Sequence, residues 1–226
     1  MKGKSLIEKI EYLSSFMTDE RFAVIRSTLD SRTDYIAVCL ENTFHPHNAS
    51  AVIRSCEAFG IQDIHVVETL VRFSPSVDIV KGTQKWVDLH RYGDEANPSS
   101  ALISRLKGDG YRIVATSPHA GDKTPEEFDV AAGKFALFFG TEKDGITEEV
   151  LENADEFIRI PMYGFVESLN ISVCAAILLH ILSEKVRREV DGWQIGEPRR
   201  TEILYRWMMA SVRDSKNIIK RFESQR

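Results

Sequence analysis

The chain has 226 residues and a mass of 25.7 kDa, enough for one compact domain with an appendage or for two small domains. Hydrophobic residues make up 43% and charged residues 28%, which argues against disorder, and the formal net charge of −5 disfavours an obligate nucleic-acid binder. No apolar run reaches the roughly 18 residues of a membrane span, and the three cysteines lie in apolar runs, so we expect a reduced, cytoplasmic protein without a membrane segment.

In chain order, the pattern predicts two short helices, an α/β region and a terminal helix. Apolar residues recur at helical spacing in the first thirty residues, and Thr18 is placed to cap the second helix. Predicted strands cover residues 35–40, 64–67, 112–115, 135–139 and 157–160, with helices at 48–59, 97–107, 148–153 and 169–187. A linker, Gly192–Pro198, precedes one helix, Glu202–Phe222. Alternating strands and helices indicate an α/β fold with a parallel sheet.

We expect three parts: an N-terminal helical extension over residues 1–33, an α/β domain over 34–190, and a linker with a basic helix over 191–226. Charge separates along the chain. Residues 1–184 carry 18 basic and 28 acidic side chains, whereas residues 185–226 carry 11 and 6. A basic tail can mark nucleic-acid binding, although a solvated amphipathic helix gives the same pattern.

Three loops after predicted strands carry polar side chains: residues 42–48, 140–145 and 161–170. In parallel sheets, ligands bind at this edge. None of the loops is a phosphate cradle, because Ile146-Thr147 stands where a P-loop needs Lys-Ser/Thr and no G-x-G-x-x-G follows a strand. A nucleotide-like ligand here is therefore expected to lack a pyrophosphate, which disfavours NTPases and NAD enzymes and leaves room for cofactors such as S-adenosylmethionine.

Other chemistries have weaker support. His45 and His47 lack Cys or His partners at ligand spacing, so we expect no metal site. Ser168 stands in S-L-N-I-S rather than in a G-x-S-x-G elbow. Cys56 and Cys174 lie on apolar helix faces and are interpreted as packing residues.

Several polar residues have an ordinary structural interpretation when taken singly. On the helix after the first loop, Ser50, Arg54 and Glu57 are predicted to lie opposite the apolar face, and Arg54 is spaced to pair with Glu57. Asn48 is placed as an N-cap. Glu142 reads as a solvated loop acid and Asn170 as the cap of the buried helix.

Three segments together resemble the motifs of one enzyme family. They are residues 47–60 (HNASAVIRSCEAFG), 138–146 (FFGTEKDGI), and 160–162 (IPM) with 168–176 (SLNISVCAA). In order and spacing they are similar to the three motifs of the SpoU/TrmH family of SPOUT RNA 2′-O-methyltransferases, from about Tyr35 to Arg188. His47-Asn48 and Lys85-Trp86-Val87 are closest to its tRNA guanosine-2′-O-methyltransferase branch.

The resemblance implies a parallel sheet flanked by helices with a C-terminal deep trefoil knot, although knots are nearly absent from proteins. It also implies N- and C-terminal helical extensions that contact tRNA, and a homodimer whose interface includes the motif-one loop and the helix after Asn170. Ala175 and Ala176 would suit close helix approach there. The cofactor S-adenosyl-L-methionine would lie against six residues, largely through backbone groups: Thr116, Gly140, Ile160, Met162, Ser168 and Leu169.

By the same resemblance, the reaction methylates a ribose 2′-hydroxyl of tRNA, at a D-loop guanosine of the guanosine-18 type. The implied catalytic residues are Arg54, Asn48, Glu142, Ser168 and Asn170. The family assigns deprotonation to the arginine at position 54, but a guanidinium normally stays protonated. We favour a composite role, in which Arg54 binds the adjacent phosphate and stabilises the developing alkoxide. Literal proton abstraction would need help from the phosphate or from Asn48 and Ser168, while Glu142 and Asn170 would position these groups.

Two departures from the family pattern bear on the substrate: His45 stands where lysine is expected, and Glu167 where glutamine is usual. Both lower the positive charge near the RNA path. The alternatives are the same chemistry on rRNA or at another tRNA position, and a non-catalytic RNA-binding protein on the same fold. Pure binding does not require the five polar residues, which favours the enzyme.

Overall fold

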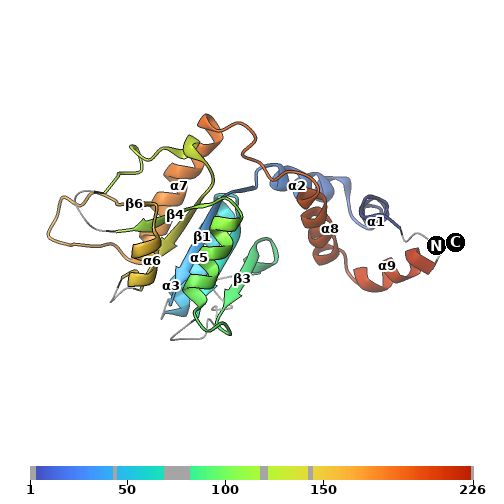
Figure 1. Cartoon of the computed structure of the whole chain (residues 1–226). Helices are drawn as coiled ribbons and strands as arrows, with labels where there is room; N and C mark the ends of the chain where they lie inside the picture. Colours follow the sequence, from blue (N-terminus) through green and yellow to red (C-terminus); the bar gives the residue numbers. More distant parts are fainter. Residues whose placement is uncertain (1–3, 43–44, 69–81, 118–121, 142–144, 225–226) are drawn as a thin grey trace. The chain divides into compact units, whose positions relative to one another are not determined.

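The computed structural model describes residues 4–42, 45–68, 82–117, 122–141 and 145–224. Two compact units make up the chain (Figure 1). One, called here the helical unit, joins Met1–Arg32 with Gln194–Arg226; the other, the sheet unit, is Thr33–Trp193. No helix in the described ranges has both the length and the apolarity to cross a bilayer.

The sheet unit is built on a six-stranded sheet in the order β3-β2-β1-β5-β4-β6, with every neighbouring pair parallel. The strands are β1 (Thr33–Glu41), β2 (Ile61–Val67), β3 (Asp88–Tyr92), β4 (Arg112–Thr116), β5 (Phe135–Phe139) and β6 (Glu156–Ile158). The predicted parallel α/β class is therefore confirmed.

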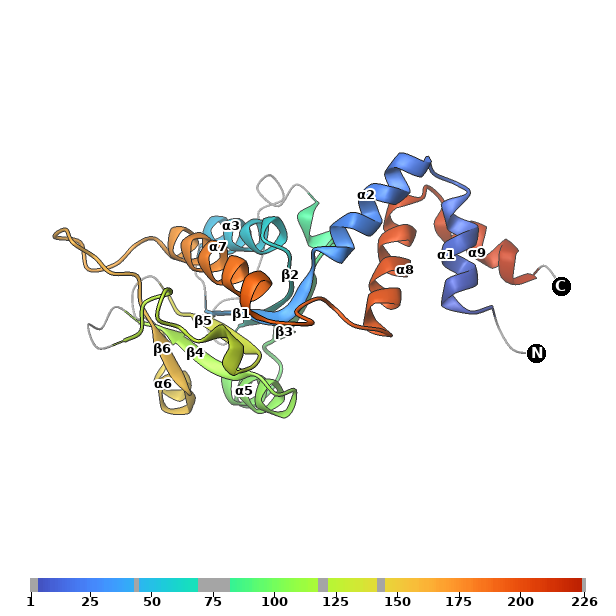
Figure 2. The same cartoon turned by 90° about the horizontal axis from the view of Figure 1, so that it is seen from above.

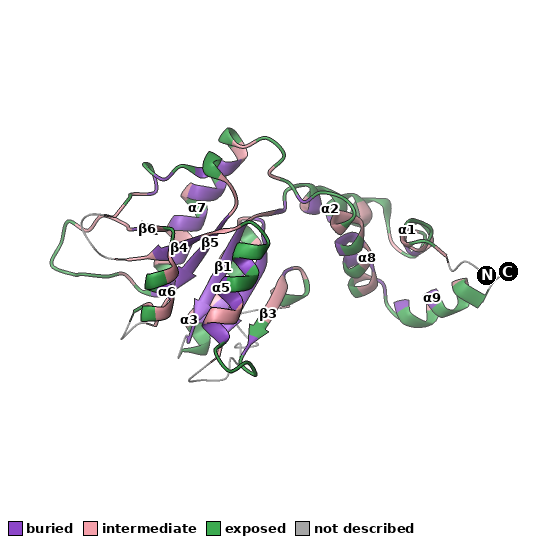
Figure 3. Cartoon of the chain, in the orientation of Figure 1, coloured by how far each residue is buried: buried purple, intermediate pink, exposed green. Residues whose placement is uncertain are grey.

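Helices cover both faces of the sheet (Figure 2). The helices and 3-10 turns of this unit are α3 (Pro46–Ala58), η1 (Thr83–Lys85), α5 (Pro98–Gly108), η2 (Val130–Ala132), α6 (Glu148–Asn153) and α7 (Ile171–Glu189). Helices α3 and α7 pack together on one face, and α5 and α6 cover the other. The central strands are buried on both sides (Figure 3), as near-continuous apolar strands of a parallel sheet should be.

Strand β3 was not predicted from the sequence. Its residues, Asp-Leu-His-Arg-Tyr, form no apolar run. Among the described strands it pairs with β2 alone and lies at the sheet edge, where most of its side chains are partly exposed. An edge position tolerates polar residues, so the usual hydrophobic signal is missing.

In the helical unit, the two ends of the chain fold together. Its helices are α1 (Leu6–Ser14), α2 (Asp19–Asp30), α8 (Arg199–Ser211) and α9 (Ser215–Ser224). Helix α1 packs against α8 and α9, with the Tyr12 ring stacked on Phe222 at a centroid distance of 4.2 Å and Lys9 Nζ 2.6 Å from Glu223 Oε1. Thr18 caps α2 as predicted, accepting from the Arg21 N–H.

The prediction of a single terminal helix over Glu202–Phe222 is wrong. The structure has two helices, α8 and α9, separated by Val212 in an extended conformation and Asp214 at φ 58°. Aspartate tolerates the left-handed region better than most residues. The break turns the chain so that Phe222 reaches Tyr12 on α1.

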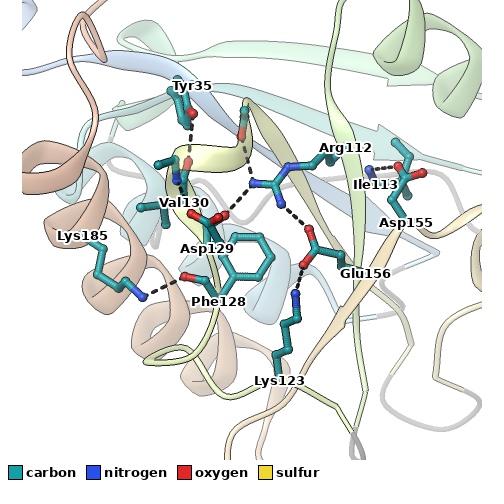
Figure 4. Close-up of polar contacts among 12 residues, drawn as sticks. Tyr35, Arg112, Ile113, Lys123, Phe128, Asp129, Val130, Asp155, Glu156 and Lys185 are labelled. Atoms are coloured by element: carbon teal, nitrogen blue, oxygen red, sulfur yellow. Dashed lines mark hydrogen bonds and ion pairs between the residues drawn. The ribbon is translucent and has the colours of Figure 1, made fainter.

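A polar network holds the connection from β4 to β5 (Figure 4). The Arg112 guanidinium donates to the carbonyls of Asp129 (2.9 Å) and Gly133 (3.0 Å) and pairs with Glu156 on β6. Lys185 on α7 donates from Nζ to the carbonyls of Pro125, Glu126 and Phe128 at 3.2, 2.7 and 2.8 Å. The connection is thereby attached to α7 and to the sheet, near the start of β4.

Candidate functional site

The carboxyl ends of β4 and β5 carry two of the predicted cofactor-binding residues. Thr116 is the last residue of β4, and its Oγ1 donates to the Phe138 carbonyl of β5 at 2.9 Å. Gly140 follows β5 directly. Because the two strands pair in parallel, Thr116 and Gly140 lie at the same sheet edge, where ligands bind in this class of fold.

Gly140 begins a closed turn. Thr141 and Gly145 exchange backbone hydrogen bonds of 2.8 and 3.2 Å. A Cβ at position 140 would lie 2.1 Å from the carbonyl carbon and oxygen of Gly145, so the close approach requires glycine. Glu142 lies outside the described residues.

The remaining predicted cofactor residues lie between β6 and α7. Ile160, Met162 and Leu169 are partly exposed, and Ser168 is exposed. Ile160 also packs against the core of the α3 and α7 face. Part-exposed apolar side chains beside backbone amides and carbonyls suit an adenosine joined to a methionine chain, so these residues fit S-adenosylmethionine.

Motifs one and three meet at the N-termini of α3 and α7. Asn170 caps α7: its Oδ1 accepts from the backbone N–H of Ser172 at 2.9 Å and from its hydroxyl at 2.6 Å. The Asn170 Nδ2 donates to Asn48 Oδ1 at 3.2 Å. The capping interpretation of Asn170 is thus confirmed, and the same side chain also holds Asn48.

Two expectations for α3 are wrong. The helix begins at Pro46 with His45 at the N-cap, so Asn48 lies inside the first turn rather than at the cap. Proline starts the helix earlier because its fixed φ suits the first helical position. Ser50 is buried, not exposed, and its hydroxyl donates to the Pro46 carbonyl at 2.6 Å.

Arg54 points to the exposed side of α3. Within the described ranges, the Arg54 side chain forms no hydrogen bond or ion pair, and the predicted pair with Glu57 does not form. Ser168 likewise has no recorded hydrogen bond to another described residue. The structure therefore joins Asn48 to Asn170, and Thr116 to Phe138 of β5, by hydrogen bonds in which neither Arg54 nor Ser168 takes part.

The cysteines near this region are packing residues, as predicted. Cys56 is fully buried in the core, and Cys174 packs against that core on α7. Burial raises the pKa of Cys174 to about 11, so its neutral thiol predominates near neutral pH. Among the described residues, no group of three or more His, Cys, Asp or Glu side chains is placed to hold a metal ion.

Two polar residues that lie beside the site, Ser172 and Glu41, were not identified from the sequence. Ser172 orients Asn170, as described above. Glu41 ends β1 with 1% exposure and accepts hydrogen bonds from Ser99 and Thr147. A carboxylate directly after a buried apolar strand is a signal that could have identified Glu41.

A family model described as the SpoU rRNA Methylase family matches residues 35–180. The tRNA (guanosine(18)-2′-O)-methyltransferase of Borreliella burgdorferi is 36% identical over 217 residues, which cover 95% of this chain and 97% of the relative. The Thermus thermophilus protein of the same name is 34% identical, covering 85% of this chain and 95% of its own.

A solved structure agrees with this likeness. The TrmH/SpoU tRNA modifying enzyme of A. aeolicus aligns with a TM-score of 0.73 and 28% identity, covering 87% of this chain and 98% of that one.

Proposed function

The chain belongs to the SpoU rRNA methylase family, and from that membership we propose that it is a tRNA (guanosine-2′-O)-methyltransferase of the guanosine-18 type. The observation that carries this function is similarity along nearly the whole chain to relatives with that name. It extends through both terminal segments, beyond the three motifs.

We propose S-adenosyl-L-methionine as the methyl donor, held by Thr116 and Gly140 at the sheet edge and by the segment that carries Ile160, Met162, Ser168 and Leu169. When bound, it supplies an electrophilic methyl group on a sulfonium. Methyl transfer to the ribose 2′-oxygen would leave S-adenosylhomocysteine, and the hydroxyl proton would pass to the adjacent RNA phosphate or to water. This displacement needs an aligned oxygen and a stabilised developing charge.

Arg54 would stabilise that charge while binding the adjacent RNA phosphate. Its exposed place on α3, without a recorded partner in the described ranges, leaves the guanidinium fork available for a phosphate and an alkoxide together. The Asn170–Asn48 hydrogen bond supports a positioning role for both amides. Glu142 remains part of the proposal by its place in motif two.

Labelled methyl transfer tests the function. An unmodified tRNA transcript should accept one methyl group, and a matched transcript with 2′-deoxyguanosine at the target position should accept none. Transfer to the deoxy transcript, or transfer to rRNA alone, would contradict the proposal.

We also propose a homodimer. Beside the site, Tyr163 and Phe165 are 96% and 108% exposed, and Val173 on α7 is 45% exposed. Large apolar side chains this exposed favour burial against a partner, here a second copy. Ala175 does not serve this interface, because it is buried in the protomer core. Sedimentation at micromolar concentration should give a dimer; a monomer there would contradict this.

The deep trefoil knot is a further part of the proposal. Strand β6 lies at the sheet edge, whereas the next element, α7, packs against α3 on the face that covers β1. Residues 159–170 must therefore return across the end of the sheet. An experimental backbone trace of residues 117–190 would decide whether this return passes through a loop of the chain.

A further inference from the structure

Glu41 carries a buried carboxylate at the sheet edge where the motif-one and motif-two segments begin. It is the last residue of β1, 1% exposed, and lies one position beyond the Leu40–Phe139 pair of the sheet. Asn42, which follows, turns the chain at φ 50° toward motif one. Across the sheet, Gly140 begins the motif-two turn, so Glu41 lies between both segments.

Three hydrogen bonds reach this carboxylate from two other elements. Ser99 Oγ, in the first turn of α5, donates to Oε1 at 2.5 Å. Thr147 donates twice, from Oγ1 to Oε1 at 2.9 Å and from its backbone N–H to Oε2 at 3.1 Å. Thr147 is the N-cap of α6, yet its side chain makes no capping bond, so its hydroxyl serves Glu41 instead.

The bonds to Thr147 hold the end of the motif-two turn. Thr147 follows Gly145-Ile146 directly, and Gly140 is packed so tightly against these two residues that no Cβ fits. A shift of Thr147 would therefore be transmitted through Gly145 to Gly140. Hydrogen bonds to a charged group are stronger than neutral ones, and a buried carboxylate requires its donors.

The geometry points to Glu41 as a positioning residue for methyl transfer: through Thr147 it fixes the turn that sets the Gly140 backbone against the cofactor. This inference rests on the proposed function, because it assigns Gly140 to the cofactor. Glu41 itself touches neither cofactor nor RNA in this scheme. Ser99 shares the carboxylate but belongs to α5, and so provides a matched control.

The test compares Thr147→Val with Ser99→Ala. Each removes one hydroxyl bond to the same oxygen, but only the first loosens the turn. S-adenosylmethionine affinity is measured by calorimetry, and kcat and KM by methyl transfer, below the Tm of every variant. Thr147→Val should weaken cofactor binding by about fivefold, less than the full worth of one hydrogen bond to a carboxylate because this bond acts on the cofactor only through the turn, whereas Ser99→Ala should stay within about twofold of wild type.

Two substitutions of Glu41 extend the comparison. Glu41→Ala should weaken cofactor binding by more than about tenfold, and Glu41→Gln should recover part of the loss because its amide oxygen can still accept from the Thr147 N–H. Equal effects of Thr147→Val and Ser99→Ala would overturn the inference even if Glu41→Ala fails to fold. So would a folded Glu41→Ala protein with wild-type affinity. Wild-type protein that binds no cofactor would instead contradict the proposed function itself.

Discussion

At the residue scale, Asn170 performs two tasks with one amide. Both hydrogen bonds accepted by its Oδ1 come from Ser172, which leaves its Nδ2 to donate to Asn48. The first turn of α7 therefore orients the Asn170 amide, and the oriented amide holds Asn48. Capping α7 and holding Asn48 are thus two uses of the same side chain.

Replacing Asn170 separates the two tasks. Asn170→Ser keeps a good N-cap residue, so unfolding free energy should change by less than about 0.5 kcal/mol. The bond to Asn48 is lost, and kcat should fall about tenfold if that bond orients a reacting group. Urea unfolding and methyl transfer measure the two effects. Asn170→Ala loses both the helix cap and the bond to Asn48, so it should also lower the free energy of unfolding by about 1 kcal/mol. An unchanged kcat in Asn170→Ser would contradict the positioning role.

Arg54→Lys tests the guanidinium geometry. Lysine keeps the positive charge but loses the planar fork that can bind a phosphate and an alkoxide together. We expect kcat to fall by at least about tenfold, with little change in stability because Arg54 is exposed. Single-turnover methyl transfer measures this. Near-full activity would show that charge alone suffices.

At the element scale, Lys185 joins α7 to the β4–β5 connection through three carbonyls. The carbonyls belong to one short segment that has no strand or α-helix of its own. An ammonium with three donors satisfies several backbone acceptors at once. Together with Arg112, it holds this connection against the sheet and α7 (Figure 4).

Lys185→Met should lower the free energy of unfolding by about 2 kcal/mol, because charge-assisted hydrogen bonds are lost and the part-buried carbonyls of Pro125 and Phe128 lose their donor. Lys134→Met is the control: its ion pair with Asp34, at 3.5 Å with side chains 39% and 18% exposed, is worth at most about 1 kcal/mol. Urea unfolding compares the two. A smaller loss of unfolding free energy for Lys185→Met than for Lys134→Met would contradict the role of Lys185 in holding the β4–β5 connection.

At the scale of the whole molecule, the two units have opposite charge. The helical unit carries 14 basic and 9 acidic side chains, and the sheet unit 15 and 25. Because the basic tail packs with the N-terminal helices, deleting it would expose their buried face rather than test RNA binding alone. Charge substitutions on exposed positions of α9 are the better probe.

Lys216→Gln with Lys220→Gln should weaken tRNA binding and lower the slope of log affinity against log salt by about 1.5, if each lysine neutralises one phosphate. Both lysines are exposed on α9. The control pair, Lys107→Gln with Lys134→Gln in the sheet unit, should leave the slope unchanged. Equal slopes for both pairs would place the RNA surface elsewhere than on α9.

The sequence by itself determined the parallel α/β class, five of the six strands and the family, because buried strands and motif loops are encoded by local runs of residues. Only the tertiary structure decided the edge strand β3, the break before Asp214, and the contacts of Asn170 with Asn48 and of Glu41 with Thr147. Those two contacts join residues 122 and 106 positions apart. Local periodicity carries no information about such partners, which meet only when the sheet brings their loops to one edge.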